Sequence, residues 1–216
     1  MYQPAHHRED RLDVQHALIA AHPFGLLISS GAGGLLANGV PFTLDKSGSP
    51  KGTLRVHVAR ANPQAREFMG EGRDCLVVFQ GPQAYVTPSW YATKRETGKV
   101  VPTWNYVMVQ VRGHGRAHDG APWLRAQLEQ LTQEREAARS ERWNVSDAPE
   151  DFTAVMMRGI VGIEIPIDGI EGKWKVSQNR PEADRRGVHA GLVAGGEAQA
   201  AMADIVAERG GLSKGQ

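Results

Sequence analysis

Residues 104–116, W-N-Y-V-M-V-Q-V-R-G-H-G-R, alternate between small apolar residues and larger or more polar ones. Successive side chains of an extended chain point to opposite faces. The alternation therefore separates two sets of residues: Val107, Val109 and Val111 on one face, and Tyr106, Met108 and Gln110 on the other. This stretch predicts one long strand of a sheet with one buried face.

Shorter apolar runs on both sides of this stretch extend the pattern. They are F-G-L-L-I-S-S, L-L-A-N-G-V-P-F-T-L, T-L-R-V-H-V-A, C-L-V-V-F-Q-G, Q-A-Y-V-T-P, I-V-G-I-E-I-P-I and residues 172–176. Loop-forming segments rich in Gly, Pro and Asp separate several of them, and D-K-S-G-S-P-K-G at residues 45–52 is the clearest. Short apolar runs around such loops are typical of antiparallel strands.

Five helices are expected among the strands. Their predicted ranges are 9–21, 62–70, 122–142, 146–159 and 197–208. Asn62 and Pro63 are preferred at the first positions of a helix, and Phe152, Val155 and Met156 are the apolar residues of the fourth. Strands and helices do not alternate regularly, which argues against a Rossmann-type sheet, and Gly31-Ala32-Gly33-Gly34 is expected to be a hairpin turn. The order predicts a mainly β protein with helices, built as an antiparallel barrel or sandwich.

Composition narrows the class of protein. The chain has 216 residues, a net charge of +1 and no clustered basic run, so bulk electrostatics give no support to direct DNA binding. No apolar run is long enough to span a membrane, and the N-terminus lacks a signal-peptide pattern, so a cytoplasmic location is expected. The single cysteine, Cys75, lies in an apolar run and is expected to be a packed core thiol.

Residues 55–63 could bind an anion. Arg55 and His57 share one face of a predicted strand, Arg60 follows them, and the helix start at Asn62 comes next. Unpaired N–H groups at a helix start attract phosphate groups. The alternative is a surface arginine and a hydrogen-bonded strand histidine beside an ordinary helix cap.

Two other segments could contact a ligand. In A-N-G-V-P-F, Asn38 carries an amide, and Gly39 and Pro41 interrupt the strand at Val40, which leaves backbone groups free for a planar heterocycle such as a flavin or pterin. A β-bulge without a ligand fits this segment equally well. The second segment continues from Lys175 with polar residues that include Ser177 and Gln178, and a plain exposed strand end is the alternative there.

Aromatic residues gather in two neighbouring segments although they are only 6% of the chain. Trp90, Tyr91, Trp104 and Tyr106 offer flat rings with polar tips, which suit a half-exposed groove or an interface. Burial as core residues is the alternative. No metal site is expected, because His114 and His118 lie four residues apart on a predicted strand.

Five segments occur in the order found in one known family. P-F-G-L-L-I-S, H-V-A-R-A-N-P, Y-V-T-P-S-W-Y-A-T-K, V-V-P-T-W-N-Y and K-V-S-Q-N-R resemble PaiB-type proteins, also called FMN-binding negative transcriptional regulators. The resemblance covers about residues 1–195. It implies a split β-barrel related to pyridoxamine-phosphate oxidases and short-chain flavin reductases. The expected organisation is a flavin-binding domain over 1–195 with a helical insertion at about 121–158, followed by a C-terminal helix and tail over 196–216.

The resemblance also implies a homodimer with FMN in a groove between the subunits. By position, Asn38, Gly39, Val40 and Pro41 would meet the isoalloxazine edge, and His57, Arg60 and the helix start at Asn62 would hold the phosphate. Lys175, Ser177 and Gln178 would complete the site, and the V-P-T-W-N-Y strand would lie at the dimer seam.

Two functions of different classes follow. One is a regulator of gene expression with an indirect or weak contact to DNA, as the family label implies. The other is a flavin-dependent oxidoreductase acting on a small molecule, in which the flavin carries the redox chemistry. Haem handling, known among split-barrel relatives, is a third alternative.

Overall fold

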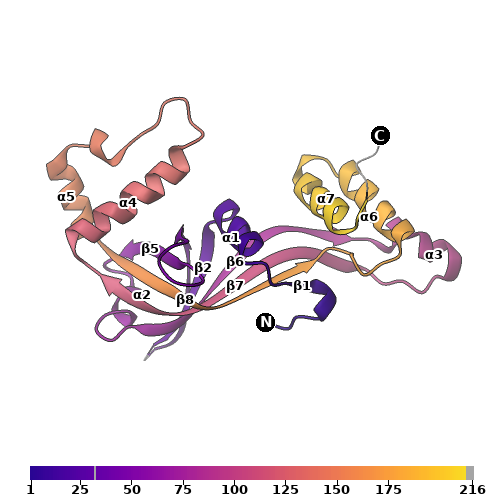
Figure 1. Cartoon of the computed structure of the whole chain (residues 1–216), viewed down its shortest axis with the longest axis horizontal. Coiled ribbons are helices and arrows are strands. Elements are labelled where there is room, and N and C mark those ends of the chain that lie inside the picture. The colour runs from indigo at the N-terminus through magenta and orange to yellow at the C-terminus, as the bar shows by residue number, and fades with distance from the viewer. Residues whose placement is uncertain (32, 213–216) are drawn as a thin grey trace. The chain divides into compact units, whose positions relative to one another are not determined.

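The computed structural model describes residues 1–31 and 33–212. The described strands form one eight-stranded sheet in the order β3-β2-β6-β7-β8-β5-β4, with β1 paired to β8 (Figure 1). The strands are β1 Arg8–Glu9, β2 Phe24–Gly31, β3 Gly34–Pro41, β4 Thr43–Asp45, β5 Thr53–Ala59, β6 Arg73–Val86, β7 Thr103–His118 and β8 Ile160–Lys175. The pairings β1–β8, β2–β3, β2–β6, β4–β5 and β5–β8 are antiparallel.

Helices occupy the connections between the strands and the C-terminal part of the chain. They are α1 Leu12–Ala21, α2 Pro63–Glu67, α3 Ala92–Thr97, α4 Ala121–Glu136, α5 Glu150–Arg158, α6 Glu182–Ala194 and α7 Glu197–Arg209, with 3-10 turns η1 Ala5–His7, η2 Pro88–Trp90 and η3 Val145–Asp147. None of the helices in the described part of the chain is long and apolar enough to span a membrane.

The chain divides into two compact units. The first unit comprises residues 1–18, 80–109 and 171–216, and the second unit comprises residues 19–79 and 110–170. The ranges of β6, β7 and β8 contribute residues to both.

The second unit holds the barrel. β3 and β4 lie at opposite ends of the strand order, yet only Phe42 separates them in the chain. The sheet must therefore curl until its two ends approach each other, and β3 indeed contacts β5 without a ladder between them. Phe42, Val56, Val77 and Ile163 are among its fully buried side chains. The result is an incompletely closed barrel.

Two short features of the second unit follow the sequence prediction. Asn62 caps α2, with its Oδ1 accepting a hydrogen bond from the Gln64 backbone N–H at 3.0 Å, and Pro63 is the first helical residue. The predicted hairpin joins β2 and β3, where Gly31 pairs with Gly34. Ala32 lies outside the described residues.

The helices α4 and α5 cover one side of the barrel (Figure 1), and α4 contacts β4, β5 and α5. Gly159 ends α5 as predicted, but the predicted apolar residues of this helix do not pack inward. Phe152, Val155 and Met156 are each at least half exposed, while Thr153 and Met157 are buried. Burial of Thr153 is possible because its hydroxyl donates to the Pro149 carbonyl at 3.1 Å.

The first unit contains a helix that was not predicted. α6 packs against α7, α3 and η2, and its sequence E-A-D-R-R-G-V-H-A-G-L-V-A contains two glycines and only three apolar residues larger than alanine. Gly187 and Gly191 face Trp90 so closely that a Cβ atom at either position would collide with it. The glycines that weakened the helical signal are thus what permits the packing.

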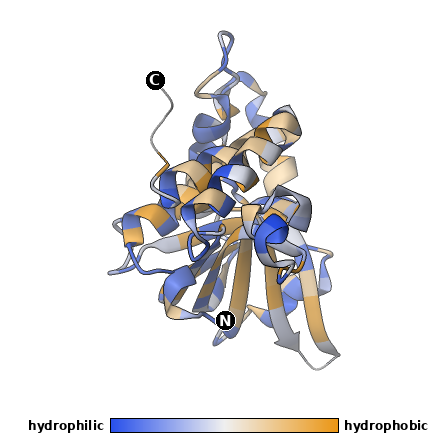
Figure 2. Ribbon diagram, turned by 90° about the vertical axis from the view of Figure 1, so that its right-hand side faces the viewer, coloured by the Kyte–Doolittle hydropathy of each residue, from blue (hydrophilic) through white to orange (hydrophobic). Residues whose placement is uncertain are grey.

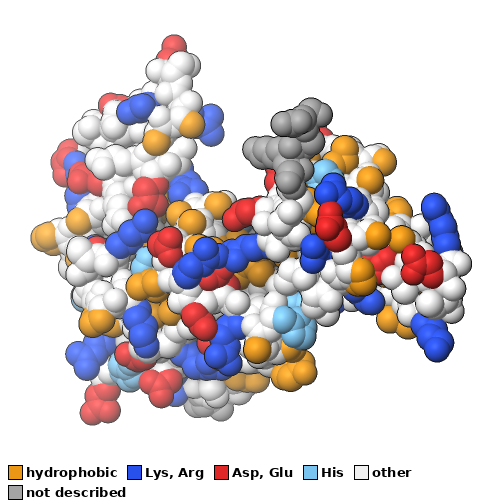
Figure 3. Space-filling model, turned by 45° about the vertical axis from the view of Figure 1, so that its right-hand side comes forward, with side chains coloured by type: hydrophobic (Ala, Val, Ile, Leu, Met, Phe, Trp, Pro, Cys, Tyr) orange, Lys and Arg blue, Asp and Glu red, His pale blue; other side chains and the backbone are white. Residues whose placement is uncertain are grey.

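The predicted alternation over residues 104–116 is confirmed in β7. Val107, Val109 and Val111 are at most 1% exposed, whereas Tyr106 and Met108 are half-buried. Apolar residues along the strands can be followed in Figure 2. Figure 3 shows basic and acidic side chains interspersed over the visible face.

Candidate functional site

The edge of β3 in the second unit carries the segment predicted to meet a heterocycle. β3 ends the strand order, so one row of its backbone groups has no partner strand among the described residues. Asn38, Val40 and Pro41 are half-buried and Gly39 is exposed. A Cβ atom at residue 39 would lie 2.8 Å from Phe24 Cε1. A side chain here would therefore displace the exposed Phe24 ring, and glycine avoids that contact.

A hydrogen-bond chain connects this edge to α2. Asn38 Nδ2 donates to Gln64 Oε1 at 2.8 Å. Gln64 is fully buried, and its Nε2 donates to the Leu27 carbonyl at 3.1 Å and to Ser29 Oγ at 3.0 Å. Ser29 in turn donates to Glu67. The structure thus brings together Asn38 and the helix start at Asn62, two predicted site elements from different segments.

The start of α2 has few donors left for a phosphate. Pro63 has no N–H group, the Gln64 N–H donates to Asn62 Oδ1, and the Ala65 N–H donates to the Asn62 carbonyl at 3.0 Å. The first three helical residues therefore offer no free backbone donor. Any phosphate near this helix would have to be held by side chains.

Arg60 lies at the end of β5 and is anchored to the C-terminal end of α5. Its backbone N–H donates to the Gly159 carbonyl at 2.8 Å, Nε to the Arg158 carbonyl at 2.9 Å, and Nη2 to the Ile160 carbonyl at 3.1 Å. A guanidinium group has five N–H donors, so the remaining ones stay available. Arg60 also lines a cavity of about 400 Å³ together with Arg158.

His57 is half-buried, and one of its ring nitrogens contacts α4. Its Nδ1 is 2.8 Å from Oε1 of Gln127, a residue of α4 that is 1% exposed. The Gln127 Nε2 has no hydrogen-bond partner among the described residues. One ring nitrogen of His57 is therefore engaged within the unit, and its role in holding a phosphate stays a prediction.

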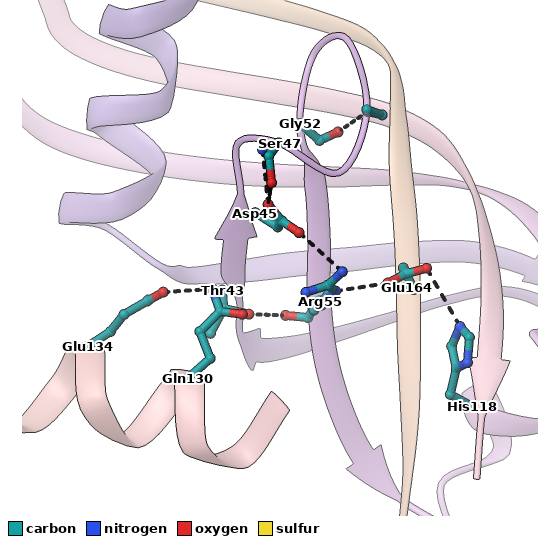
Figure 4. A network of polar contacts seen from close by, with 10 residues as sticks. Thr43, Asp45, Ser47, Gly52, Arg55, His118, Gln130, Glu134 and Glu164 are labelled. Atoms are coloured by element: carbon teal, nitrogen blue, oxygen red, sulfur yellow. Dashed lines mark hydrogen bonds and ion pairs between the residues drawn. The ribbon is translucent and has the colours of Figure 1, made fainter. Parts of the chain in front are cut away.

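The same face of β5 carries an ionic network (Figure 4). Arg55 donates from Nε to Glu164 Oε2 at 2.8 Å, and its Nη2 lies 3.2 Å from Asp45 Oδ2. His118 Nε2 lies 3.8 Å from Glu164 Oε1, and its ring stacks on Trp123. Arg55 thus bridges two carboxylates within the second unit, so we assign this network a structural role.

Lys175, Ser177 and Gln178 belong to the first unit, where each has partners. Lys175 Nζ donates to the Trp104 carbonyl at 2.6 Å and to Thr103 Oγ1. Burial lowers the Lys175 pKa, and nearby Lys173 and Arg180 lower it further. Gln178 Nε2 donates to the His6 carbonyl at 2.8 Å.

Ser177 has an uncommon backbone conformation. It is the one non-glycine residue with a positive φ in the described part of the chain, at 65°. Its Oγ donates to Oδ1 of buried Asn105 at 3.1 Å. The predicted polar strand end is therefore an ordered turn.

The four predicted interface aromatics fall into two groups within the first unit. Trp90 packs against α6, and Tyr91 is 1% exposed with the Arg180 guanidinium 4.9 Å from its ring centroid. Burial raises the Tyr91 pKa. Because its ring is buried, Tyr91 can support the protein surface from below but offers almost no area to a second subunit. Trp104, by contrast, is 53% exposed.

Sequence reasoning missed two residues of this aromatic surface. Tyr85 is exposed and meets Trp104 edge to face, with the ring centroids 6.0 Å apart. Lys173 is buried, and its ammonium lies 5.4 Å from the ring centroid of Tyr106. Alternation over the whole strands could not have indicated them: in β6 the buried positions change from odd to even numbers before Tyr85, and in β8 residues 172–174 are all buried.

His114 and His118, which are not expected to bind a metal, both have other partners. His114 lies 2.8 Å from Asp74 Oδ1 and 2.8 Å from the Glu71 carbonyl, contacts that raise its pKa, with the carbonyl contributing most. No group of three or more His, Cys, Asp or Glu side chains suited to a metal occurs among residues 1–31 and 33–212.

Comparison with known proteins identifies the family. Residues 1–169 match the family model described as "Putative FMN-binding domain". The chain is 36% identical to an uncharacterized protein of Emericella nidulans, over 97% of this chain and 98% of that one. It is 29% identical to the protease synthase and sporulation protein PAI 2 of Bacillus subtilis, over 85% of each chain.

A solved structure supports the fold independently. The FAD and heme binding protein of Mycobacterium smegmatis superimposes with a TM-score of 0.56 at 16% identity, covering 78% of this chain and 73% of that one. The split-barrel prediction is confirmed. The chain therefore belongs to the FMN-binding domain family, and the predicted resemblance to PaiB-type proteins and the predicted cofactor, FMN, are confirmed with it.

Proposed function

We propose that the protein is a homodimer that holds FMN noncovalently and uses it for redox chemistry on a small molecule. The observation that carries this proposal is the open edge of β3 with Asn38 fixed by Gln64. Backbone N–H and C=O groups alternate along an edge strand and suit the alternating donors and acceptors of an isoalloxazine edge. Gly39 leaves this row accessible.

The residues of the second unit also suit the tail of FMN. Arg60 is four residues from Gln64, and that length of chain spans at most about 14 Å. Asn38 hydrogen-bonds to Gln64, so ring edge and phosphate could be held by neighbouring parts of one unit. An arginine anchored through carbonyl groups is well suited to an oxyanion because its planar donors are already oriented.

When bound, FMN supplies electron and hydride transfer, and the chain supplies position and electrostatics. Asn38 and the β3 edge would orient the ring, and Arg60 would neutralise the phosphate. The exposed Trp104 and Tyr85 support the homodimer, since aromatic rings are enriched at protein interfaces. Lys175, Ser177 and Gln178 lie beyond the residues that the family model matches, and their role toward FMN stays a prediction.

The direct test is titration of FMN into flavin-free protein, followed by flavin fluorescence. We expect Arg60→Ala to weaken binding by ~1.5–3 kcal/mol, the usual contribution of a charge-assisted hydrogen bond, and Asn38→Ala to weaken it as well. Arg142→Ala is the matched control because this exposed arginine has the same charge and lies in the same unit. If Arg60→Ala and Asn38→Ala bind FMN as tightly as the wild type and Arg142→Ala do, Arg60 and the β3 edge do not form the FMN site.

Anaerobic mixing of the flavin-loaded protein with NADH or NADPH tests the redox part. Loss of the flavin absorbance band with either donor is expected. An unchanged spectrum with both would contradict reduction by a nicotinamide and with it the simplest oxidoreductase mechanism.

Regulation of gene expression is the second candidate, favoured by the relationship to PAI 2, which is named as a sporulation protein. The net charge of +1 and the interspersed charges in Figure 3 argue for an indirect or weak contact with DNA. A salt-dependent mobility shift of promoter DNA would support direct regulation. The lack of a shift at low salt would contradict it.

A further inference from the structure

The second unit contains a cavity of about 400 Å³ at the start of α4, the end of α5 and the end of β5. We call it the α4–α5 cavity. Its volume falls within the range of small-molecule sites, about 300–1,000 Å³. Arg60, Asp119, Leu124, Met157 and Arg158 are among its lining residues.

Two arginines give the cavity a positive wall. Arg60 is held by the Arg158 and Ile160 carbonyl groups, so its guanidinium is oriented while some of its donors remain free. The Arg158 guanidinium has no hydrogen-bond or ion-pair partner among the described residues. The first residue of α4, Ala121, also lines the cavity, and the positive end of that helix dipole favours an anion. The last residues of α5, Met157 and Arg158, line it too, so the negative end of the α5 dipole opposes this effect.

Apolar side chains make up much of the rest of the lining. Leu124 is 1% exposed and Met157 is 8% exposed, and both contribute to the lining. Asp119 is the single carboxylate named in the lining, and it would repel an anion and so limit the affinity. A lining that combines two arginines with apolar side chains matches a molecule that carries an acidic group on an apolar body.

We propose that the α4–α5 cavity binds a small molecule bearing a phosphate or carboxylate group on an apolar body, with Arg60 and Arg158 holding the anionic group. The inference deepens the proposed function and rests on it in one respect, because the anionic group has two sources. It belongs either to FMN itself or to a separate acid that occupies the cavity beside the bound flavin.

The experiment uses phenyl phosphate, FMN and riboflavin as probes in calorimetric titrations of the full chain. Arg158→Met is the main variant, because this side chain has no partner to lose and the fold should survive. We expect it to weaken phenyl phosphate binding by roughly tenfold or more. Asp119→Asn should strengthen binding severalfold, and Arg142→Met, a matched exposed arginine, should leave it unchanged.

The flavins distinguish the two sources. If Arg158→Met weakens FMN but not riboflavin, and FMN-loaded protein no longer takes phenyl phosphate, the cavity holds the FMN phosphate. If FMN affinity is unchanged and the loaded protein still binds phenyl phosphate, the cavity takes a separate acid. Both results support the oxyanion site.

The proposal is overturned if neither the flavin-free nor the FMN-loaded protein binds phenyl phosphate and Arg158→Met leaves the FMN affinity unchanged. It is also overturned if phenyl phosphate binds equally to the wild type and to Arg158→Met. Failure of the proposed function looks different: neither flavin would bind, while phenyl phosphate binding would still respond to residues 119 and 158.

Discussion

Glu9 is a nearly buried carboxylate in the first unit, 3% exposed and held by two arginines. Arg11 donates from Nε to Oε1 at 2.9 Å and from Nη2 to Oε2 at 2.6 Å, and Arg209 Nη1 lies 2.6 Å from Oε2. The hydrogen bonds from Arg11, with those from Arg209, lower the Glu9 pKa to about 2. Glu9 thereby ties the N-terminal segment to α7.

This geometry predicts a pH-dependent contribution to stability. The folded-state pKa lies below the unfolded value, so the stabilisation is fully present above about pH 4.5 and is lost as the pH falls through about 2. Glu9→Gln should lower the free energy of unfolding by roughly 3 kcal/mol at pH 7. Urea denaturation at several pH values measures the difference between the two proteins.

Asp10→Asn is the control for Glu9→Gln. Its carboxylate is exposed and lies 3.9 Å from Arg8, so its removal should change stability little at any pH. A constant difference between Glu9→Gln and wild type from pH 7 down to pH 2 would contradict the assignment of the effect to the charge.

The thiol of Cys75 provides a second test at the scale of a single residue. Cys75 is 8% exposed, its Sγ donates to the Gly113 carbonyl at 3.4 Å, and burial raises its pKa to about 12. We expect no labelling by iodoacetamide in the native protein at pH 8 and complete labelling in urea, since the thiolate is the reactive form. Mass spectrometry counts the adducts, and rapid native labelling would contradict the burial.

Single residues also show which parts of the candidate site could be predicted from the sequence and which could not. The Asn62 cap was predicted because its hydrogen bond is local in sequence. The partners of Asn38, His57 and Arg60 lie 26, 70 and about 100 residues away along the chain. Residue type indicated which side chains could hold a ligand, but only the tertiary contacts decide which donors remain free.

At the scale of elements, the contact between α6 and Trp90 makes an unusual prediction for a helical glycine. Gly→Ala within a helix normally stabilises by about 0.5–1 kcal/mol. At Gly191 the added Cβ would collide with the Trp90 ring. We therefore expect Gly191→Ala to destabilise the protein and to shift its tryptophan fluorescence.

A double-mutant cycle isolates this effect. In a Trp90→Ala background the obstructing ring is absent, so Gly191→Ala should become neutral or stabilising. Thermal unfolding of the four proteins provides the comparison. The same loss of stability in both backgrounds would show that the collision is not the cause.

Elements with a strong local signal were predicted well, and those defined by packing were not. β7 has strict alternation, and α2 and α7 lie within a few residues of their predicted ranges. α4 ends at Glu136, earlier than the predicted 142, and α1 begins at Leu12 rather than at residue 9. α3 was missed because A-T-K-R-E-T has no large apolar residue, and α6 because its two glycines weaken the helical signal. Packing of α6 against α3, η2 and α7 stabilises these helices instead.

At the scale of the whole molecule, burial separates the surface aromatics from the core aromatics. Phe42, Phe68, Phe79 and Tyr91 are at most 1% exposed, so they complete the interior of their units. Trp104 and Tyr85 remain outside and touch each other. A surface ring pair of this kind exposes apolar area that a second copy could cover, which is the basis of the proposed homodimer.

The proposed homodimer predicts a specific sensitivity at Trp104. Placing a charge there with Trp104→Glu should weaken self-association by at least tenfold, because an unpaired carboxylate would have to be desolvated at the interface.

Trp143 is a matched control: it is 50% exposed against 53% for Trp104, but it lies in the second unit and outside the aromatic pair. Sedimentation velocity over a range of concentrations gives the dissociation constants. Wild type and Trp143→Glu should sediment as dimers at concentrations where Trp104→Glu is monomeric, with circular dichroism confirming that all three are folded. A Trp104→Glu protein that stays dimeric, or a wild type that is monomeric when saturated with FMN, would place the interface elsewhere or exclude it.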